Sequence, residues 1–312
     1  MTHHQAIANV LGGMTIGRVW YDEPMSRHAS LKLGGRVDAL VMTESEDQLG
    51  LVVQRLTAGN IPFLPVGNLT NILVRDGGYR GVLLWMRGLD QMSLTKAQDE
   101  KDVISAQAGV PLGKVVSLAA AEALTGLEFC AGIPGSVGGA VWMNAGAYGA
   151  EMKDVVAEVM VIDGRGEKKI LKRGEIAFTY RTSNLPGDVI VCGARFLLQH
   201  GQIAQIRERM TEIIKWRHEK HPLQYPNAGS VFKNLPGMPA GKLIEELGLK
   251  GVRRGDVQIS KKHANFIVNK GQGTATDMET LIAFVREQVR KARGIDLETE
   301  IVIIGEGLER ER

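Results

Sequence analysis

Several features that would place a chain in a special class are scarce or missing. The 312 residues include two cysteines, Cys130 and Cys192, which form neither a Cys-x-x-Cys pair nor a disulfide framework. No apolar run approaches the ~18 residues that a membrane-spanning helix needs. No basic residue precedes Arg18, which argues against a secretory signal. We therefore expect a cytoplasmic protein of a reducing compartment, with no membrane partner.

The excess of positive over negative charge is small, and aromatic residues are also scarce. The 38 Lys and Arg residues against 35 Asp and Glu residues leave a net charge of +3, and aromatic residues make up 5%. No run of five or six basic residues occurs, so nucleic acid is not an expected partner. With 44% hydrophobic residues and nearly balanced charge, the chain is not a disordered one. Its length allows about two domains at ~150 residues each.

Glycine, in contrast, is abundant: 38 of 312 residues, against ~7% in average proteins. The densest run is Gly132-Ile133-Pro134-Gly135-Ser136-Val137-Gly138-Gly139-Ala140, followed closely by Asn144-Ala145-Gly146-Ala147-Tyr148-Gly149. Small side chains let a ligand lie against the backbone, whose N–H groups can bind a pyrophosphate. The alternative is a tight packing crossover. Neither the Rossmann nor the Walker pattern is present, so a phosphate site needs another fold.

Helical and strand patterns alternate along the chain. They predict helices over residues 49–56, 111–124, 202–218, 241–247 and 277–293, and strands over 61–66, 81–86, 102–110, 155–163, 168–171, 188–199, 263–269 and 300–305. Asp277 is expected to cap the last helix. The change in character of the last ~90 residues predicts a domain boundary near residue 200.

Two polar turns are candidate ligand sites. Val66–Asn71 follows a strand and offers Asn and Thr side chains, although the segment taken alone favours a plain turn. Tyr180–Asn184 contains Arg181, which could clamp a carboxylate but could also be solvated surface.

Three later segments carry further polar residues. Ser230 lies in Asn227–Asn234, which is not a G-x-S-x-G elbow, so a hydrolase triad is not supported. Lys262 and His263 precede a predicted strand and could meet an anion or be solvated. Strand alternation would place Glu298 and Glu300 on one face. His218 and His221 lack further ligands nearby, so no metal site is expected.

In order, the motifs GIPGSVGGA, NAGAYG, YRTSNL, NAGSVFKN, PAGKLIEELGLKG, KKHANFIVN and LETEIVIIG closely resemble the family of UDP-N-acetylenolpyruvoylglucosamine reductases (MurB) from about Ser30 to Gly305. The resemblance implies an α+β protein. Its FAD-binding domain of the PCMH (vanillyl-alcohol-oxidase) type is expected over residues 1–200, in two α+β lobes that divide near residues 85–100. A C-terminal α+β substrate domain follows over residues 201–312. No inserted tyrosine-bearing loop is evident, as in the shorter, type II members.

The activity implied is reduction of the enolpyruvyl ether of UDP-N-acetylglucosamine to UDP-N-acetylmuramic acid in peptidoglycan precursor synthesis. FAD, bound non-covalently, is reduced by NADPH and delivers a hydride to C3, and a proton then reaches C2. By resemblance Ser230 is the general acid, a nearby lysine, Lys233, could relay charge to it, and Arg181 stabilises the enolate. Glu300 either hydrogen-bonds the enolate in its protonated form or orients the group that does.

The resemblance also assigns binding residues. Those for the cofactor are Gly67, Asn68, Leu69, Thr70, Asn71, Gly132, Ile133, Pro134, Gly135, Ser136, Gly138, Gly139, Ala140, Asn144 and Gly146, and those for the substrate are Tyr148, Lys233, Asn234, Lys262 and His263. The chain departs from the family pattern at Asn68-Leu69 and at Arg254, where glycine is frequent.

Two other functions remain open. Another FAD oxidoreductase or oxidase of the same fold would share the glycine loops but not the Ser230 and Glu300 motifs. A non-enzymatic nucleotide-sugar binding module would bind no flavin and would be colourless.

Overall fold

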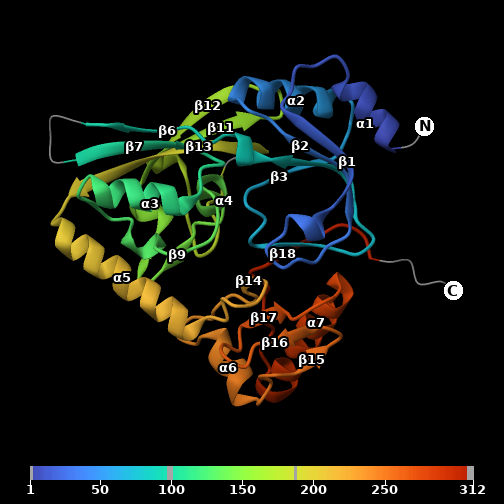
Figure 1. The fold of residues 1–312 in the computed structure, drawn as a ribbon, viewed down its shortest axis with the longest axis vertical. Coiled ribbons are helices and arrows are strands. Elements are labelled where there is room, and N and C mark those ends of the chain that lie inside the picture. Colours follow the sequence, from blue (N-terminus) through green and yellow to red (C-terminus); the bar gives the residue numbers. More distant parts are fainter. Residues whose placement is uncertain (1–2, 97–100, 186–187, 308–312) are drawn as a thin grey trace. The chain divides into compact units, whose positions relative to one another are not determined.

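The computed structural model describes residues 3–96, 101–185 and 188–307 (Figure 1). It divides into two compact units, each treated separately below. The first unit comprises Met1–Tyr21, Ala39–Asn68 and Gly81–Trp216, and the second comprises Asp22–Asp38, Leu69–Arg80 and Arg217–Arg312. The predicted division between lobes near residues 85–100 includes residues 97–100, which lie outside the described residues.

A four-stranded sheet has the order β1-β2-β5-β3, formed by β1 (Arg18–Pro24), β2 (Arg36–Met42), β5 (Tyr79–Trp85) and β3 (Phe63–Val66). In the first unit, helices α1 (His3–Leu11) and α2 (Glu46–Ala58) share an apolar core with it. Ser45 caps α2 by accepting from the Gln48 amide at 3.2 Å, and Gly59 follows its end. The periodic positions that predicted this helix, Leu49, Val52, Val53 and Leu56, are all buried.

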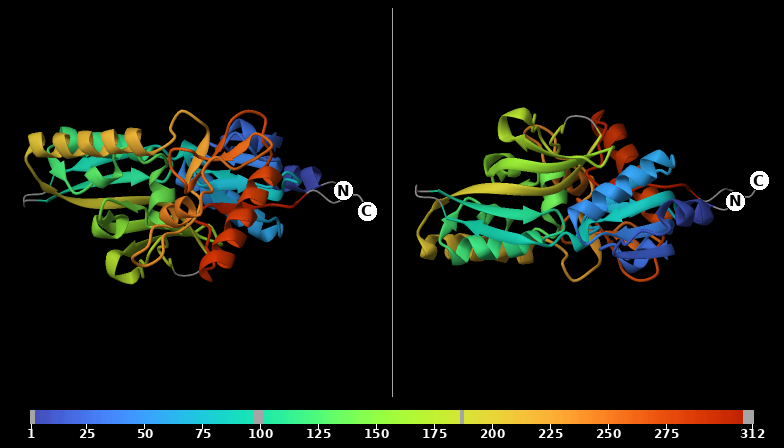
Figure 2. Two further views of the ribbon diagram at one scale, coloured as in Figure 1. Left: turned by 90° about the horizontal axis from the view of Figure 1, so that it is seen from below. Right: turned by 90° about the horizontal axis from the view of Figure 1, so that it is seen from above.

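A larger sheet fills the rest of the first unit. Its main path is β12-β11-β13-β7-β6, and β8 pairs with β13; the strands are β6 (Met92–Thr95), β7 (Lys101–Gln107), β8 (Leu124–Thr125), β11 (Val156–Asp163), β12 (Lys168–Lys172) and β13 (Val189–His200). The predicted hairpin is confirmed, because β11 and β12 pair antiparallel. The long strand β13 lies between β11 and β7 in this sheet, and its olive to yellow arrow can be followed in both views of Figure 2.

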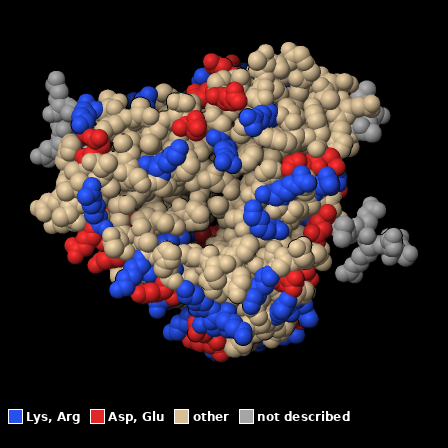
Figure 3. Space-filling view, viewed as in Figure 1, with Lys and Arg blue, Asp and Glu red and all other residues tan. Residues whose placement is uncertain are grey.

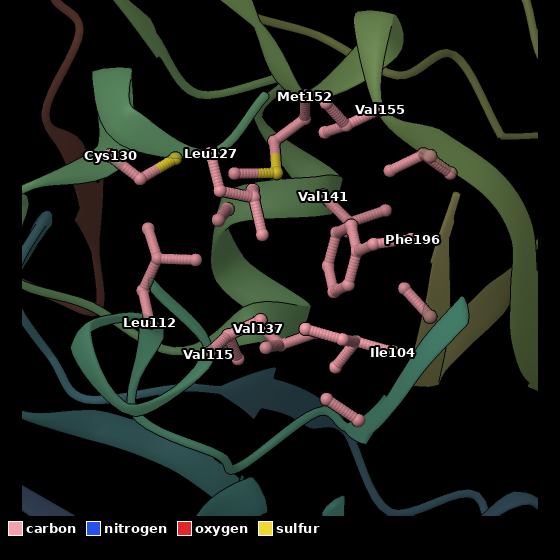
Figure 4. Close-up of a cluster of buried hydrophobic side chains, with 14 of the residues drawn as sticks. Ile104, Leu112, Val115, Leu127, Cys130, Val137, Val141, Met152, Val155 and Phe196 are labelled. Atoms are coloured by element: carbon pink, nitrogen blue, oxygen red, sulfur yellow. The ribbon is translucent and has the colours of Figure 1, made fainter. Parts of the chain in front are cut away.

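Two helices and a small hairpin complete this region. They are α3 (Leu112–Ala121), α4 (Val137–Trp142) and the β9 (Gly146–Ala147) and β10 (Ala150–Glu151) pair. Figure 4 shows apolar side chains of α3 and α4, such as Val115 and Val141, in one cluster with Phe196 of the sheet. Sequence analysis missed α4, because its two glycines disfavour a helix; burial of Val137, Ala140 and Val141 accompanies helix formation there.

The second unit has a core of its own. Strands β14 (Asn227–Ser230), β17 (Phe266–Asn269), β16 (Val257–Ile259) and β15 (Arg253–Arg254) form a sheet in that order, and β4 (Ile72–Val74) pairs parallel with β18 (Val302–Ile304). Helices α6 (Ala240–Glu246) and α7 (Ala275–Arg293) bury residues in the core that holds Phe232 and Leu281. Helix α5 (Ile203–Lys220) links the two units along the chain.

Two details of the second unit differ from the predictions. Thr274, not Asp277, is the N-cap of α7: its hydroxyl accepts from the Asp277 amide at 3.0 Å, while the Asp277 carboxylate accepts from the Thr274 amide. The last strand begins at Val302 rather than residue 300. Strand alternation therefore does not apply to Glu298 and Glu300, of which the first is exposed and the second half-buried.

Short 3-10 helices cover Met25–Arg27, Met86–Gly88, Glu128–Cys130, Met152–Asp154 and Arg173–Glu175. Among the described residues, no helix combines the length and apolar character needed to span a membrane. The boundary near residue 200 between a cofactor domain and a substrate domain stays a prediction.

Candidate active site

A cavity of about 480 Å³ lies within the first unit, beside the glycine-rich run. Its wall includes Val66 and Gly67 at the end of β3, and Ser136, Gly138 and Gly139 around the start of α4. The volume falls within the range of small-molecule sites. The structure therefore brings two sequence-predicted glycine motifs, separated by more than sixty residues, to one cavity.

The backbones approach closely because glycine stands at two positions. A Cβ on Gly67 would lie 2.3 Å from Ser136 Oγ, and a Cβ on Gly138 would lie 2.7 Å from Ala108 Cβ. Asn68 links the turn after β3 to the glycine-rich run, since its Nδ2 donates to the Gly135 carbonyl at 3.0 Å. This contact gives a structural use to one of the departures from the family pattern.

The cavity wall contains an unsatisfied polar atom. Ser136 is 1% exposed, and its Oγ has no hydrogen-bond partner among the described residues. A buried hydroxyl without a partner is costly, and a polar ligand in the cavity would satisfy it. Not every amide of the run is free for a ligand, because Val137 and Gly138 donate to the carbonyls of Val110 and Ala108. Small residues, close backbone and an unpartnered hydroxyl fit a phosphate-bearing cofactor such as FAD.

Other predicted cofactor residues have different surroundings. Leu69, Thr70 and Asn71 belong to the second unit. Leu69 is buried with φ 54°, in the left-handed region that favours glycine, and its carbonyl accepts from the Ser30 amide. Asn71 Nδ2 donates to the Glu300 carbonyl at 3.0 Å. Arg254, the second departure, is exposed on β15.

The buried thiols offer no reactive cysteine. Cys130 is 0% exposed and lies in the apolar core of the first unit (Figure 4). Burial raises the pKa of its thiol well above the ordinary value, with the Glu128 charge acting the same way. Burial likewise raises the pKa of Cys192 to about 12. Thiols of this kind are poor nucleophiles.

Arg181 lies at a tight turn in the first unit. The amide of Thr179 donates to the Thr182 carbonyl at 2.9 Å, and the amide of Thr182 donates back at 3.2 Å. Arg181 itself has φ 58°, and its guanidinium lies 4.9 Å from the centre of the Tyr180 ring. The side chain is half-buried rather than freely solvated.

A second cavity, of about 600 Å³, lies within the second unit. Its wall includes Ser230, Asn234, Lys262 and His263, which sequence analysis predicted, together with lysines that it missed: Lys220, Lys242 and Lys250. Lysine and arginine side chains gather over the part of the face in Figure 3 that the C-terminal residues form. Glu245 and Glu246 also line this cavity, where Lys250 pairs with Glu245 at 2.5 Å and Lys242 lies 3.8 Å from Glu246. Lys220 and Lys262 leave the wall with an excess of positive charge, which is suited to an anionic ligand. Lys220 lies outside the quoted motifs, whereas Lys242 and Lys250 lie within PAGKLIEELGLKG, although sequence analysis did not assign them to a site. The folding of the chain brings all three to the cavity of Ser230.

Ser230 and Glu300 come together through the backbone. The Glu300 amide donates to the carbonyl of Val231, the residue after Ser230, at 2.8 Å. An antiparallel bridge between Phe232 and Thr299 extends this contact. Both Ser230 and Glu300 are half-buried. The structure thus juxtaposes two predicted catalytic residues that are 70 positions apart in the chain.

Two predicted substrate residues have partners inside their own unit. Lys233 Nζ pairs with Glu298 Oε2 at 3.1 Å, so its ammonium is directed to a carboxylate. Tyr148, exposed at the tip of the β9–β10 hairpin, has its ring centre 5.7 Å from that of Trp216. Neither contact shows a ligand site.

His263, in the wall of the second cavity, packs against two other rings. Its ring centre lies 5.6 Å from that of His221 and 4.9 Å from that of Phe266. Burial, followed by the charges of Arg217, His263 and Lys262, lowers the pKa of His221 to about 4. Burial also lowers the pKa of His263, and the Lys250 charge adds to this effect. Both imidazoles are therefore neutral near pH 7. Among the described residues, no three His, Cys, Asp or Glu side chains gather as a metal site.

The fold and a match to a family model together identify the class of protein. Residues 37–171 match the family model of an FAD binding domain. Together with the glycine-lined cavity, this match identifies the chain as an FAD-binding flavoprotein, and the predicted α+β fold with a PCMH-type FAD domain is confirmed.

The comparisons also give the family. Residues 221–304 match the model of the UDP-N-acetylenolpyruvoylglucosamine reductase C-terminal domain. The reductase of Syntrophus aciditrophicus is 48% identical over 97% of each chain, and that of Clostridium tetani is 42% identical over 98% of this chain and 99% of its own. The MurB crystal structure from Thermus caldophilus has a TM-score of 0.78 at 34% identity, covering 92% of this chain and 99% of its own. The chain belongs to the MurB family of UDP-N-acetylenolpyruvoylglucosamine reductases.

Proposed function

We propose that this chain reduces the enolpyruvyl ether of UDP-N-acetylglucosamine to UDP-N-acetylmuramic acid, with FAD as cofactor and NADPH as electron donor. The observation that carries the proposal is the juxtaposition of Ser230 and Glu300 through the Glu300–Val231 hydrogen bond, with Ser230 in a lysine-lined cavity. In this proposal residues 1–200 hold FAD and residues 201–312 hold the sugar nucleotide.

FAD, when bound, supplies the transfer of two electrons from NADPH to C3 of the enolpyruvyl group. Addition at C3 places negative charge on C2 and on the adjacent carboxylate, as an enolate. Preorganised positive charge stabilises such a species more than it stabilises the substrate. The Arg181 guanidinium is planar and always charged, so it is the group we assign to the enolate.

Ser230 is the group we assign to protonation of C2. Its hydroxyl is half-buried in the wall of the second cavity. Serine is a weak acid, but the enolate carbon is strongly basic, and a positioned donor accelerates such a transfer. The pairing of Lys233 with Glu298 gives no support to a proton relay through that lysine.

Glu300 acts beside Ser230. Its backbone is fixed on two sides, because its amide donates to Val231 and its carbonyl accepts from Asn71 Nδ2. A carboxyl group held in this way can orient the reacting enolate, or donate a hydrogen bond to it in the protonated form. Positioning of this kind contributes to catalysis by removing misaligned arrangements.

The lysines of the second cavity are suited to the substrate diphosphate. Lys262 is held near the cavity by its bond from Nζ to the His218 carbonyl at 2.5 Å. Lys220 adds positive charge to the same wall, whereas Lys250 pairs with Glu245 of that wall. Lysine is a common phosphate ligand, so this cavity favours a sugar nucleotide over the uncharged substrates of a sugar or alcohol oxidase.

The test separates the two half-reactions. Wild type and Ser230→Ala are each reduced anaerobically with NADPH and then mixed with enolpyruvyl-UDP-N-acetylglucosamine. We expect both to be reduced at similar rates, and reoxidation by the enol ether to be at least ~100-fold slower in Ser230→Ala, the size typical of general-acid catalysis. Normal reoxidation of the variant would remove Ser230 from this role. Wild-type enzyme that reoxidises only in air would favour an oxidase.

A further inference from the structure

Asn144, which follows α4, uses its side chain entirely within the protein. It is 0% exposed. Its Nδ2 donates to the Thr179 carbonyl at 2.9 Å and to Glu151 Oε2 at 3.0 Å, and its Oδ1 accepts from the Lys153 amide at 3.0 Å. Both amide hydrogens are therefore used, and neither is left for a ligand. Thr179 is the first residue of the turn that presents Arg181.

Glu151 is the second part of the same arrangement. Its Oε2 accepts from Lys153 Nζ at 2.6 Å as well as from Asn144. Glu151 lies opposite Gly146 in the β9–β10 pair, and a Cβ on Gly146 would be 2.6 Å from Glu151 Cγ. Glycine at position 146 therefore lets the Glu151 side chain pass toward Asn144. This gives the glycine a role without any ligand.

The positive charge of Arg181 contributes to the pKa of Glu151. Partial burial acts to raise the pKa of Glu151, but hydrogen bonds from Lys153 and Asn144, with the charges of Lys153 and Arg181, hold that pKa below its ordinary value. The carboxylate is thus ionised and attracts the guanidinium, and it is joined to the Arg181 turn through Asn144 Nδ2, which donates both to Glu151 and to the Thr179 carbonyl. In the low-dielectric surroundings of a half-buried site, such attraction helps to fix where the guanidinium lies.

The Arg181 turn needs such support because its backbone is strained. A non-glycine residue at φ 58° adopts a left-handed conformation at an energetic cost. Conformations of this kind persist where the surroundings over-determine them. Besides Asn144, the turn is held by Ser183, whose hydroxyl donates to the Trp142 carbonyl at 2.8 Å, and by Asn184, whose Nδ2 donates to the Ala177 carbonyl at 2.8 Å.

We propose that Asn144 and Glu151 are positioning residues for Arg181. Asn144 fixes the Thr179 carbonyl and so the turn, Glu151 fixes the guanidinium by its charge, and Gly146 makes room for Glu151. In this proposal the segment at residues 144–151 supports the turn that holds Arg181 and does not itself bind FAD. This inference rests on the proposed role of Arg181 in stabilising the enolate.

The main test is Asn144→Asp. Aspartate has the same shape and tolerates a positive φ, such as the 44° found at this position, but it cannot donate to Thr179 and repels Glu151. We expect normal FAD content, reduction by NADPH within about twofold of wild type, and reoxidation by the enol ether at least ~10-fold slower, since small misplacements cost much rate. Glu151→Gln, which keeps the acceptor and removes the charge, is the second variant should Asn144→Asp fold poorly.

A matched control and a double mutant make the test specific. Glu158→Gln removes another partly buried carboxylate of the first unit, which pairs with Arg195 at 2.6 Å, and should leave both half-reactions unchanged. In an Arg181→Ala background, Asn144→Asp should cause no further slowing, because it acts through Arg181. Wild-type reoxidation in both single variants, or equal slowing with and without Arg181, would overturn the inference. Wild-type reoxidation of Arg181→Ala itself would instead overturn the proposed role of Arg181, and the inference with it.

Discussion

The backbone amide of Glu300 donates to the carbonyl oxygen of Val231 at 2.8 Å, directly beside Ser230. A strand end and a loop that are far apart in the chain therefore share one rigid contact. The carbonyl oxygen of Glu300 in turn accepts a hydrogen bond from Asn71 Nδ2. Because the contact uses main-chain atoms, a substitution at Glu300 changes the carboxyl group without removing the bond that places it.

This makes Glu300→Gln a clean test of the carboxyl group. The amide side chain has the same shape, and the Val231 and Asn71 hydrogen bonds stay. We expect unchanged FAD content and unchanged reduction by NADPH, with reoxidation by the enol ether slowed by about 10²-fold or more, the effect of losing one preorganised group at a developing charge. Stopped-flow measurement of the flavin absorbance gives both rates. Unaltered reoxidation would show that Glu300 takes no part.

Ser136→Ala tests whether the unpartnered hydroxyl binds the cofactor. Because Ser136 Oγ makes no hydrogen bond to the described residues, its removal should leave the thermal stability of the apoprotein unchanged or higher. FAD affinity should fall about fivefold to tenfold, since one hydrogen bond contributes ~1 kcal/mol. Titration of the apoprotein with FAD measures this.

Ser183→Ala is the contrasting variant for that experiment. Its hydroxyl donates to Trp142 and is 2% exposed, so its removal should destabilise the apoprotein by ~1 kcal/mol. Unchanged FAD affinity in Ser136→Ala would mean that the hydroxyl does not face the cofactor.

The lysines around the second cavity should affect substrate binding. Lys262→Met and Lys220→Met are each expected to raise the KM for the enolpyruvyl substrate about tenfold, because each removes a charge facing the diphosphate. Lys261→Met is the matched control, since Lys261 neighbours Lys262 but does not line the cavity. Steady-state kinetics at two salt concentrations would reveal the charge effect, which salt weakens. Equal changes in Lys261→Met would point to net charge instead.

His221 predicts a pH dependence of stability. Its pKa is lowered from 6.5 to about 4 in the folded protein. Between these values the unfolded chain binds more protons, so the free energy of unfolding should fall as the pH drops from about 6.5 toward 4, with the full contribution present above 6.5. Urea unfolding of wild type and His221→Gln at pH 7 and pH 5 measures this. The loss between these pH values should be smaller in the variant, whereas an equal loss in both proteins would assign the effect to other groups.

Local patterns predicted most elements of the fold, because helix periodicity at Leu49–Leu56 and the glycine turn between β11 and β12 depend on neighbouring residues alone. These patterns failed where tertiary contacts determine the secondary structure. They did not predict α4, because its two glycines disfavour a helix. The predicted helices also did not include α1, which begins at His3.

The candidate site shows the same division. Motif order indicated Arg181, Ser230 and Glu300, whose roles remain proposals. No local signal indicated Lys220, and the motif that contains Lys250 did not show that this lysine lies in the same cavity as Ser230. Nor could the sequence show that Asn144 and Gly146, expected at the cofactor, have contacts that support the Arg181 turn.

The most direct measurement is an anaerobic one on the wild-type protein. Its flavin is reduced with NADPH, enolpyruvyl-UDP-N-acetylglucosamine is added, and the flavin spectrum and the products are followed. The proposed function predicts rapid return of the oxidised flavin band together with formation of UDP-N-acetylmuramic acid. A flavin that stays reduced with the enol ether present, and is reoxidised only when air enters, would contradict it.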